Sequence, residues 1–190
     1  QAIPAQNQAA DFVISDSDAI GQGGAKTKFK HNLAAIETLR RIQQEDRPAT
    51  KDEQKILAKW VGWGGLGAAF YREDGSVAKG WDTEAKQLKE ELLTPEEYQS
   101  AQDSTIAAHY TSPQVVKAMW AAVQRMGFAG GRVLEPSVGS GNFLGLVPKD
   151  LRRGTQFYGT ELDSITGGIA QQLYPAARIK VLGFQEYTVP

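Results

Sequence analysis

Residues 132–144 read Arg-Val-Leu-Glu-Pro-Ser-Val-Gly-Ser-Gly-Asn-Phe-Leu, and this stretch decides the expected fold. A short run of strand-forming residues ends in the carboxylate of Glu135, and Pro136 then stops the strand. Two glycines separated by a single residue, Gly139 and Gly141, open the next element. Glycine is needed where the backbone takes positive φ or lies against a ligand without a Cβ in the way. The stretch therefore predicts a strand-to-helix loop that wraps a small ligand at the carboxyl edge of a parallel sheet.

Glu135 distinguishes this loop from a dinucleotide-binding loop. A dinucleotide loop presents helix-terminal N–H groups to a pyrophosphate, and a carboxylate on the strand tip would weaken that contact. A ligand that carries an ammonium or sulfonium group would be helped by the same carboxylate. Pro136 inside the loop also argues against a nicotinamide dehydrogenase. That alternative would be favoured again if NAD competed for the same site.

The second half of the chain has an alternating pattern. Ser112-Pro113 begins a helix, and Gly127 closes it. The apolar residues Val115, Met119, Val123 and Met126 are expected to share one face of this helix. Strand candidates follow near 132–135, 156–161 and 178–182, with helical or loop segments between them. Strands that alternate with helices predict a parallel sheet with right-handed crossovers. We therefore expect an α/β fold with about three parallel strands.

The first half of the chain is predicted to be mainly helical. Apolar residues three or four apart between Ala25 and Asp46 indicate an amphipathic helix. Thr50-Lys51-Asp52-Glu53 is typical of a capping box that begins a second helix, which is expected to reach about Val61. Asp82 and Thr94-Pro95 mark two further helix starts. The chain is divided accordingly into a polar tail or docking arm at 1–22, a helical region at 23–105 and a ligand-binding part at 106–190.

Composition narrows the class of protein. The 190 residues, 41% of them hydrophobic, are enough for one or two small cores. No apolar run approaches the roughly 20 residues of a membrane span, and the first ten residues lack the segments of a signal peptide. Cysteine is absent, and His31 and His109 alone cannot form an ordinary zinc site. We expect a soluble, cytoplasmic domain with no metal and no membrane contact.

Several segments, in the right order, resemble the S-adenosylmethionine-dependent DNA methyltransferases that act on the exocyclic amine of adenine. They are His-Tyr-Thr-Ser-Pro-Gln-Val-Val at 109–116, the glycine loop at 133–143, Tyr-Gly-Thr-Glu-Leu-Asp at 158–163 and Gly-Phe at 183–184. Upstream, Gly21–Lys30 and Trp60–Leu66 resemble very long phage- and plasmid-borne proteins that fuse such a methylase to a helicase. The resemblance covers about Gly21 to Phe184. It implies a Rossmann-like class I methyltransferase fold, S-adenosylmethionine as cofactor, DNA as partner, a role in restriction-modification, and the cytoplasm of a bacterial or phage-infected cell.

The resemblance also implies roles for single residues. Glu161 would accept both ribose hydroxyls, because a carboxylate offers two acceptor oxygens; the alternative is a helix cap or a solvated acid. Thr111 would contact the methionine carboxylate, which a helix N-terminus favours, or would simply cap that helix. Asp163 is expected to cap the following helix, and Gly183 stands where the family commonly has an acid. The predicted cofactor contacts are Tyr110, Thr111, Glu135, Pro136, Gly139, Gly141, Phe143, Glu161, Leu162 and Phe184.

One motif of the family is missing. No Asn/Asp-Pro-Pro-aromatic tetrapeptide occurs in the sequence, and in the family this motif holds the flipped adenine against the methyl donor. The chain opens with Gln1 and ends about where the approach to a fourth strand would begin. We therefore expect a half-sheet from a larger protein, whose C-terminal remainder is a partner, and no catalysis by this chain. The alternative is a non-catalytic DNA- or protein-binding module on a degenerate methyltransferase scaffold.

A cluster of basic residues is the candidate DNA contact. Its members are Lys26, Lys28, Lys30, Arg40 and Arg41. With a net charge of −1, nucleic-acid affinity would need such a local patch, and binding would depend on salt. The alternative is a solvated helix face, because acids follow at once.

Three aromatic side chains near these segments have two interpretations each. Trp60 and Trp63 would either stack on an extruded base or, as we favour, belong to the core. His109 is expected to pack beside Tyr110 rather than to act as a catalyst.

Overall fold

The computed structural model describes residues 10–107 and 110–188. The predicted packing of His109 lies outside the described residues. The helices are α1 (Ala25–Gln44), α2 (Lys51–Leu57), α3 (Asp82–Lys86), α4 (Pro95–Ala107), α5 (Pro113–Arg125), α6 (Asn142–Gly145), α7 (Lys149–Arg152) and α8 (Ser164–Leu173). Short turns of 3₁₀ helix form η2 (Asp16–Asp18), η3 (Gly67–Ala69) and η5 (Phe184–Glu186), and η4 (Gln87–Leu92) is a π-helix. None of the helices within these two ranges is both long and apolar enough to cross a membrane.

A single parallel sheet organises the second half of the chain. Its strands are β1 (Gly131–Glu135), β2 (Thr155–Glu161) and β3 (Arg178–Val181), in the order β1-β2-β3. Both neighbouring pairs are parallel; Leu134 lies opposite Tyr158, and Tyr158 lies opposite Arg178. The predicted three-stranded parallel α/β fold, with a mainly helical region before it, is confirmed.

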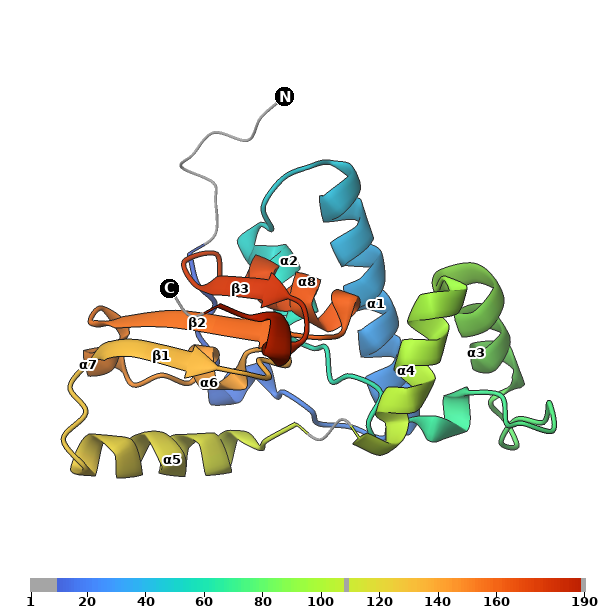
Figure 1. Cartoon of the computed structure of the whole chain (residues 1–190). Coiled ribbons are helices and arrows are strands. Elements are labelled where there is room, and N and C mark those ends of the chain that lie inside the picture. Colours follow the sequence, from blue (N-terminus) through green and yellow to red (C-terminus); the bar gives the residue numbers. More distant parts are fainter. Residues whose placement is uncertain (1–9, 108–109, 189–190) are drawn as a thin grey trace.

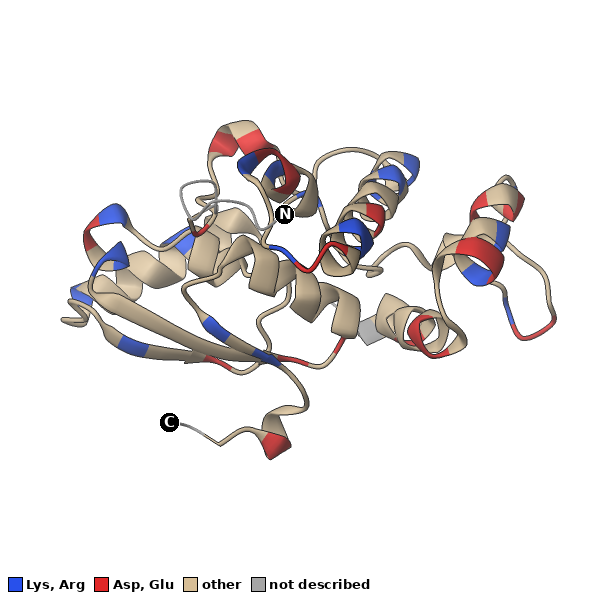
Figure 2. Ribbon diagram, turned by 90° about the horizontal axis from the view of Figure 1, so that it is seen from above, with Lys and Arg blue, Asp and Glu red and all other residues tan. Residues whose placement is uncertain are grey.

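Helices α1, α2 and α8 lie on one side of this sheet and η5 lies on the other, while α3 and α4 lie beyond the carboxyl ends of the strands (Figures 1 and 2). Helix α8 forms the middle layer, because it contacts β2 and β3 on one side and α1 and α2 on the other. Ile165, Ile169 and Leu173 of this helix are accordingly buried. A helix that is apolar on most of its circumference is stable only when covered on both sides.

The two tryptophans near the end of α2 belong to the core of the helical region. Trp60 and Trp63 are 1% and 2% exposed, and their rings meet edge to face with centroids 5.5 Å apart. The buried side chain of Asn32 holds the turn between them: it donates to the carbonyl of Gly62 at 2.7 Å and accepts from Val61 N at 3.0 Å. The core interpretation is confirmed, because a buried indole presents no face for an extruded base.

Capping predictions agree with the structure, whereas one helix end does not. Glu53 N donates to Thr50 Oγ1 at 3.3 Å and Thr50 N donates to Glu53 Oε2 at 2.9 Å, which is the predicted capping box. Helix α2 ends at Leu57 and not near Val61, since the Trp60 N–H turns back to the carbonyl of Leu57.

Helix α5 begins at Pro113 as predicted, but its predicted apolar face is not its core face. Val116 and Trp120 are buried. Val115, Met119 and Met126 are 50%, 47% and 79% exposed. The helix turns the side that carries Trp120 inward, where the indole donates to the carbonyl of Phe143 at 3.0 Å and meets Phe157 edge to face.

The segment just before η2 ties the two halves of the chain together. Phe12 N donates to the carbonyl of Leu173 at 2.8 Å, and Ile14 N donates to the carbonyl of Gly145 at 3.0 Å. The side-chain amide of Gln54 donates to the carbonyls of Ala10 and Gln172, both at 3.0 Å. These bonds fix the helical region against the sheet and so determine what surrounds the strand ends.

Candidate functional site

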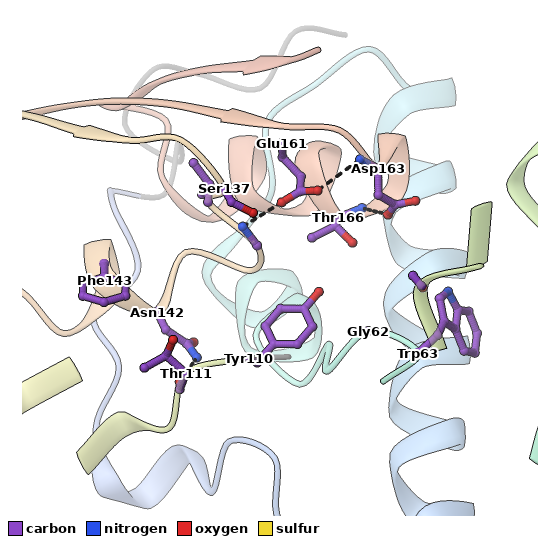
Figure 3. A pocket seen from close by; sticks show the side chains of 13 residues that line it. Gly62, Trp63, Tyr110, Thr111, Ser137, Asn142, Phe143, Glu161, Asp163 and Thr166 are labelled. Carbon is purple, nitrogen blue, oxygen red and sulfur yellow. Dashed lines mark hydrogen bonds between the residues drawn. The ribbon is translucent and has the colours of Figure 1, made fainter. Parts of the chain in front are cut away.

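A cavity of about 220 Å³ lies at the carboxyl end of β2 (Figure 3). Three parts of the chain meet there: the turn after α2, the segment before α5, and the loops that follow β1 and β2. Of the predicted cofactor contacts, the structure brings together Tyr110, Thr111, Gly139, Phe143 and Glu161. The other lining residues are Gly62, Trp63, Ser104, Ser137, Val138, Asn142, Asp163 and Thr166.

Glu161 joins the two loops that form the floor of this cavity. Its Oε2 accepts a hydrogen bond from Gly139 N at 2.8 Å, and its Oε1 accepts one from Asp163 N at 3.1 Å. Gly139 has φ +55°, a left-handed conformation that suits glycine. Each carboxylate oxygen can accept a second hydrogen bond. The two oxygens of Glu161 can therefore still take the hydroxyls of a ribose.

Asp163 begins helix α8 and stabilises its first turn. Its side chain accepts from Thr166 N at 2.8 Å, which confirms the predicted cap. Thr111 makes no such cap, because Ser112 is the N-cap of α5. The carbonyl of Thr111 instead accepts from the Asn142 amide at 3.1 Å, which ties the segment before α5 to the glycine loop.

The side chain of Tyr110 takes up part of the cavity (Figure 3). Its ring lies between Gly62 and Gly139, and a methyl group on either glycine would come within 2.5 Å or 3.1 Å of ring carbons. Burial raises the pKa of Tyr110 to about 12, although the side chains of Thr166 and Trp60 act in the opposite direction. Small-ligand pockets usually measure roughly 300–1,000 Å³. A ligand of nucleoside size would therefore extend beyond this cavity or displace the Tyr110 ring.

The other five predicted cofactor contacts do not line the cavity. Glu135 accepts from Ser137 N at 3.3 Å, and partial burial raises the pKa of its carboxyl. The carbonyl of Pro136 accepts from Thr160 Oγ1 at 2.7 Å. Leu162 and Phe184 are 77% and 50% exposed. Both acidic strand tips are predicted cofactor contacts, but only Glu161 lines the cavity, and Glu135 lies outside it.

Gly141 also stands apart from the cavity, for a packing reason. It has φ +81°, and a Cβ at this position would overlap the ring of Tyr174. Tyr174 is 1% exposed and fills the space beneath the glycine loop. Glycine is therefore required here by the protein's own core, whether or not a ligand lies on the loop.

Sequence reasoning missed the contribution of the helical region to the cavity. Gly62, Trp63 and Ser104 all come from before the predicted ligand-binding part. The indole N–H of Trp63 is buried and has no hydrogen-bond partner among the described residues. The resemblance of Trp60–Leu66 to upstream stretches of fusion proteins was a signal that this turn has a role beyond packing.

The basic cluster on α1 is largely paired with acids. Lys26 Nζ lies 2.6 Å from Glu84, Arg40 lies 2.7 Å from Glu97, and Arg41 lies 3.1 Å from Glu53. Figure 2 shows basic and acidic residues side by side along these helices. Lys28 and Lys30 make no ion pair within the described part of the chain. Such pairing weakens the case for a phosphate-binding patch, and DNA contact by this cluster stays a prediction.

Comparison with known proteins found one related sequence. No family model matches the chain. "Defense against restriction protein B" of Escherichia phage P1 is 24% identical over 169 residues, which cover 89% of this chain. The chain spans only 6% of the length of that relative.

Two solved structures give weak matches. A putative class I S-adenosylmethionine-dependent methyltransferase from Listeria monocytogenes is 11% identical, with 87% of this chain and 55% of the other covered and a TM-score of 0.34. A modification subunit of a putative type I restriction enzyme from Vibrio vulnificus is 16% identical, with 84% and 50% covered and a TM-score of 0.25. Scores this low carry no argument about the fold. Over most of its length, then, the chain is similar to a short part of a phage protein whose name refers to restriction.

Proposed function

We propose that this chain is the S-adenosylmethionine-binding part of an adenine-N6 DNA methyltransferase, within a longer methylase–helicase protein. The observation that carries the proposal is the Glu161 carboxylate at the end of β2, bonded to the N–H of Gly139 beside Thr111 and Phe143. The similarity to a phage protein named for defence against restriction supports a role connected with DNA modification.

The donor set of the cavity fits such a cofactor. Glu161 would accept the ribose hydroxyls, and Thr111 would hold the methionine carboxylate next to the N-terminus of α5. When bound, the cofactor supplies an electrophilic methyl group on sulfur.

The residues of this chain bind and orient but do not complete the reaction. Methyl transfer to an amine needs acceptors for the amine protons, a stacked aromatic ring and extrusion of the base. The family places these groups in an Asn/Asp-Pro-Pro-aromatic motif, which the sequence lacks. We therefore expect no methyl transfer when the chain is mixed with S-adenosylmethionine and adenine-containing DNA; robust turnover would refute this part of the proposal.

Titration calorimetry with S-adenosylmethionine tests the binding site. Glu161→Ala should weaken binding at least tenfold, because hydrogen bonds to a charged group contribute roughly 1.5–3 kcal/mol each. Glu135→Gln is the matched control, since this acid also ends a strand but lies outside the cavity, and its affinity should stay within about twofold. Circular dichroism shows whether Glu161→Ala remains folded, and Glu161→Gln, which keeps one acceptor, should bind with intermediate affinity.

A second function is favoured by one observation, the Tyr110 ring inside the cavity. If that ring is a permanent part of the core, the chain is a non-catalytic DNA- or protein-binding module. In that case the folded wild-type chain would show no heat of binding with S-adenosylmethionine, and Tyr110→Ala would not restore it.

A further inference from the structure

Two segments far apart in the sequence line a second, larger hollow. Residues from 21–28 and from 60–65 line a hollow of about 720 Å³, together with residues from 14–20, 110–114 and 140–146. These are the upstream stretches that the sequence singles out, and the cofactor proposal gives this hollow no role.

The second hollow adjoins the cavity that contains Glu161. Tyr110, Thr111 and Asn142 line both. The two hollows therefore adjoin at these three residues, and ligands bound in the two spaces would lie close to each other.

The lining of the second hollow combines apolar surface with amide groups. Val61, Ile20 and Leu146 provide apolar surface, and Gln22 and Gln114 provide side-chain amides. An amide offers one acceptor and two donors, the pattern that pairs with the edge of a nucleobase. A volume of about 720 Å³ lies well inside the usual range of small-ligand sites.

One charge in this hollow has no counter-charge. Lys28 is partly buried and makes no ion pair with any of the residues that the structure describes. Asp16, the acid among the lining residues, is already paired with Lys117 at 2.8 Å. An anionic group in the hollow would supply the missing counter-charge, and a phosphate suits a lysine as a point charge.

We propose that this second hollow is a nucleotide-binding site, with the base against the apolar and amide surface and the phosphate at Lys28. Its identification as the site of the methyl acceptor rests on the proposed function. Nucleotide binding itself does not, because Lys28, Gln22 and Gln114 do not line the cavity that contains Glu161.

The test follows the indole N–H signals of the tryptophans by NMR while ligand is added to the whole chain. Trp60 lines the hollow, whereas Trp120 does not and serves as an internal reference. The probes are deoxyadenosine monophosphate, deoxyadenosine and inorganic phosphate. We expect saturable shifts of Trp60 with the monophosphate, weaker binding of deoxyadenosine, and little effect of phosphate alone.

Two lysines of α1 give a matched pair of variants. Lys28→Ala should weaken binding of the monophosphate about tenfold and leave the affinity for deoxyadenosine unchanged. Lys30 lies on the same helix but outside the hollow, so Lys30→Ala should change neither affinity by more than about twofold. Gln114 is at an exposed position, and Gln114→Ala should weaken the binding of deoxyadenosine as well as that of the monophosphate. A short single-stranded oligonucleotide distinguishes a nucleotide within DNA from a free one.

The results separate this proposal from the cofactor proposal. Glu161→Ala should lose the binding of S-adenosylmethionine and keep the binding of the monophosphate. Cofactor binding without any shift of Trp60 by the monophosphate or the oligonucleotide would overturn the second site and leave the first intact. Equal effects of Lys28→Ala and Lys30→Ala would also overturn it.

Discussion

Alanine at Gly141 should destabilise the chain much more than alanine at Gly75. The two glycines have nearly the same backbone conformation, with φ +81° and +77°. They differ in their surroundings: a Cβ at Gly75 would meet no atom within 4 Å, whereas one at Gly141 would overlap the ring of Tyr174. The pair therefore separates the cost of left-handed backbone from the cost of overpacking.

The expected magnitudes follow from these two terms. Placing an L-residue in the left-handed conformation costs about 1–2 kcal/mol of folding free energy. Replacing glycine by alanine also lowers the entropy of the unfolded chain, which offsets about 0.4–1 kcal/mol of that cost. Gly75→Ala should thus lower the free energy of unfolding by about 1 kcal/mol. Forcing a methyl group into a packed core costs a further 1–3 kcal/mol or so. Gly141→Ala should accordingly lose about 2–4 kcal/mol in all.

Urea denaturation, followed by tryptophan fluorescence, measures both losses. A third measurement isolates the ring: in a Tyr174→Leu background, the change at Gly141 should cost little more than the change at Gly75. The reasoning is refuted if Gly141→Ala and Gly75→Ala are equally harmful, or if the loss at Gly141 is the same with and without the tyrosine.

Three further predictions concern buried polar groups. Gln54→Leu should lower the free energy of unfolding by about 1–3 kcal/mol, since the amide that bonds the carbonyls of Ala10 and Gln172 is lost; thermal denaturation checks this. Arg47, bonded at 2.7 Å, holds the pKa of the Glu53 carboxyl well below its usual range, so this carboxylate stabilises the fold above the unfolded pKa of about 4.3 and less as pH falls below it. The stability advantage of the wild type over Glu53→Gln should therefore shrink between pH 6 and pH 2, and a constant difference would contradict the assignment. The pKa of Tyr110 is raised to about 12, above the unfolded value of about 10, so the neutral hydroxyl stabilises the fold below pH 10 and progressively less as pH rises toward 12. Between pH 10 and pH 12 the free energy of unfolding should therefore fall less for Tyr110→Phe than for the wild type, which urea titrations measure.

Local patterns in the sequence were sufficient for most of the fold. Thr50 and Glu53 form the predicted capping box, Asp163 caps α8, and Pro113 begins α5. The three strands are parallel as expected. Such features depend on residues a few positions apart, whose hydrogen bonds and side-chain periodicity can be read along the chain.

The surroundings of the site depended on contacts that no local pattern reveals. Glu135 and Glu161 both end strands, yet Glu161 alone lines the cavity, because its neighbour Gly139 donates to it from the glycine loop. The lysines and arginines of the basic cluster resemble a positive patch in the sequence, but acids from α2, α3 and α4 pair with three of these five residues.

By itself, the sequence determined the three parallel strands, the helix starts and the acid at the end of β2, because backbone geometry and capping act over short distances. Only the tertiary structure decided that Tyr110 lines two adjoining hollows and that Lys28 lines one of them without an ion pair among the described residues. The position of a side chain between two elements depends on how those elements pack, and that packing is a balance of many distant contacts.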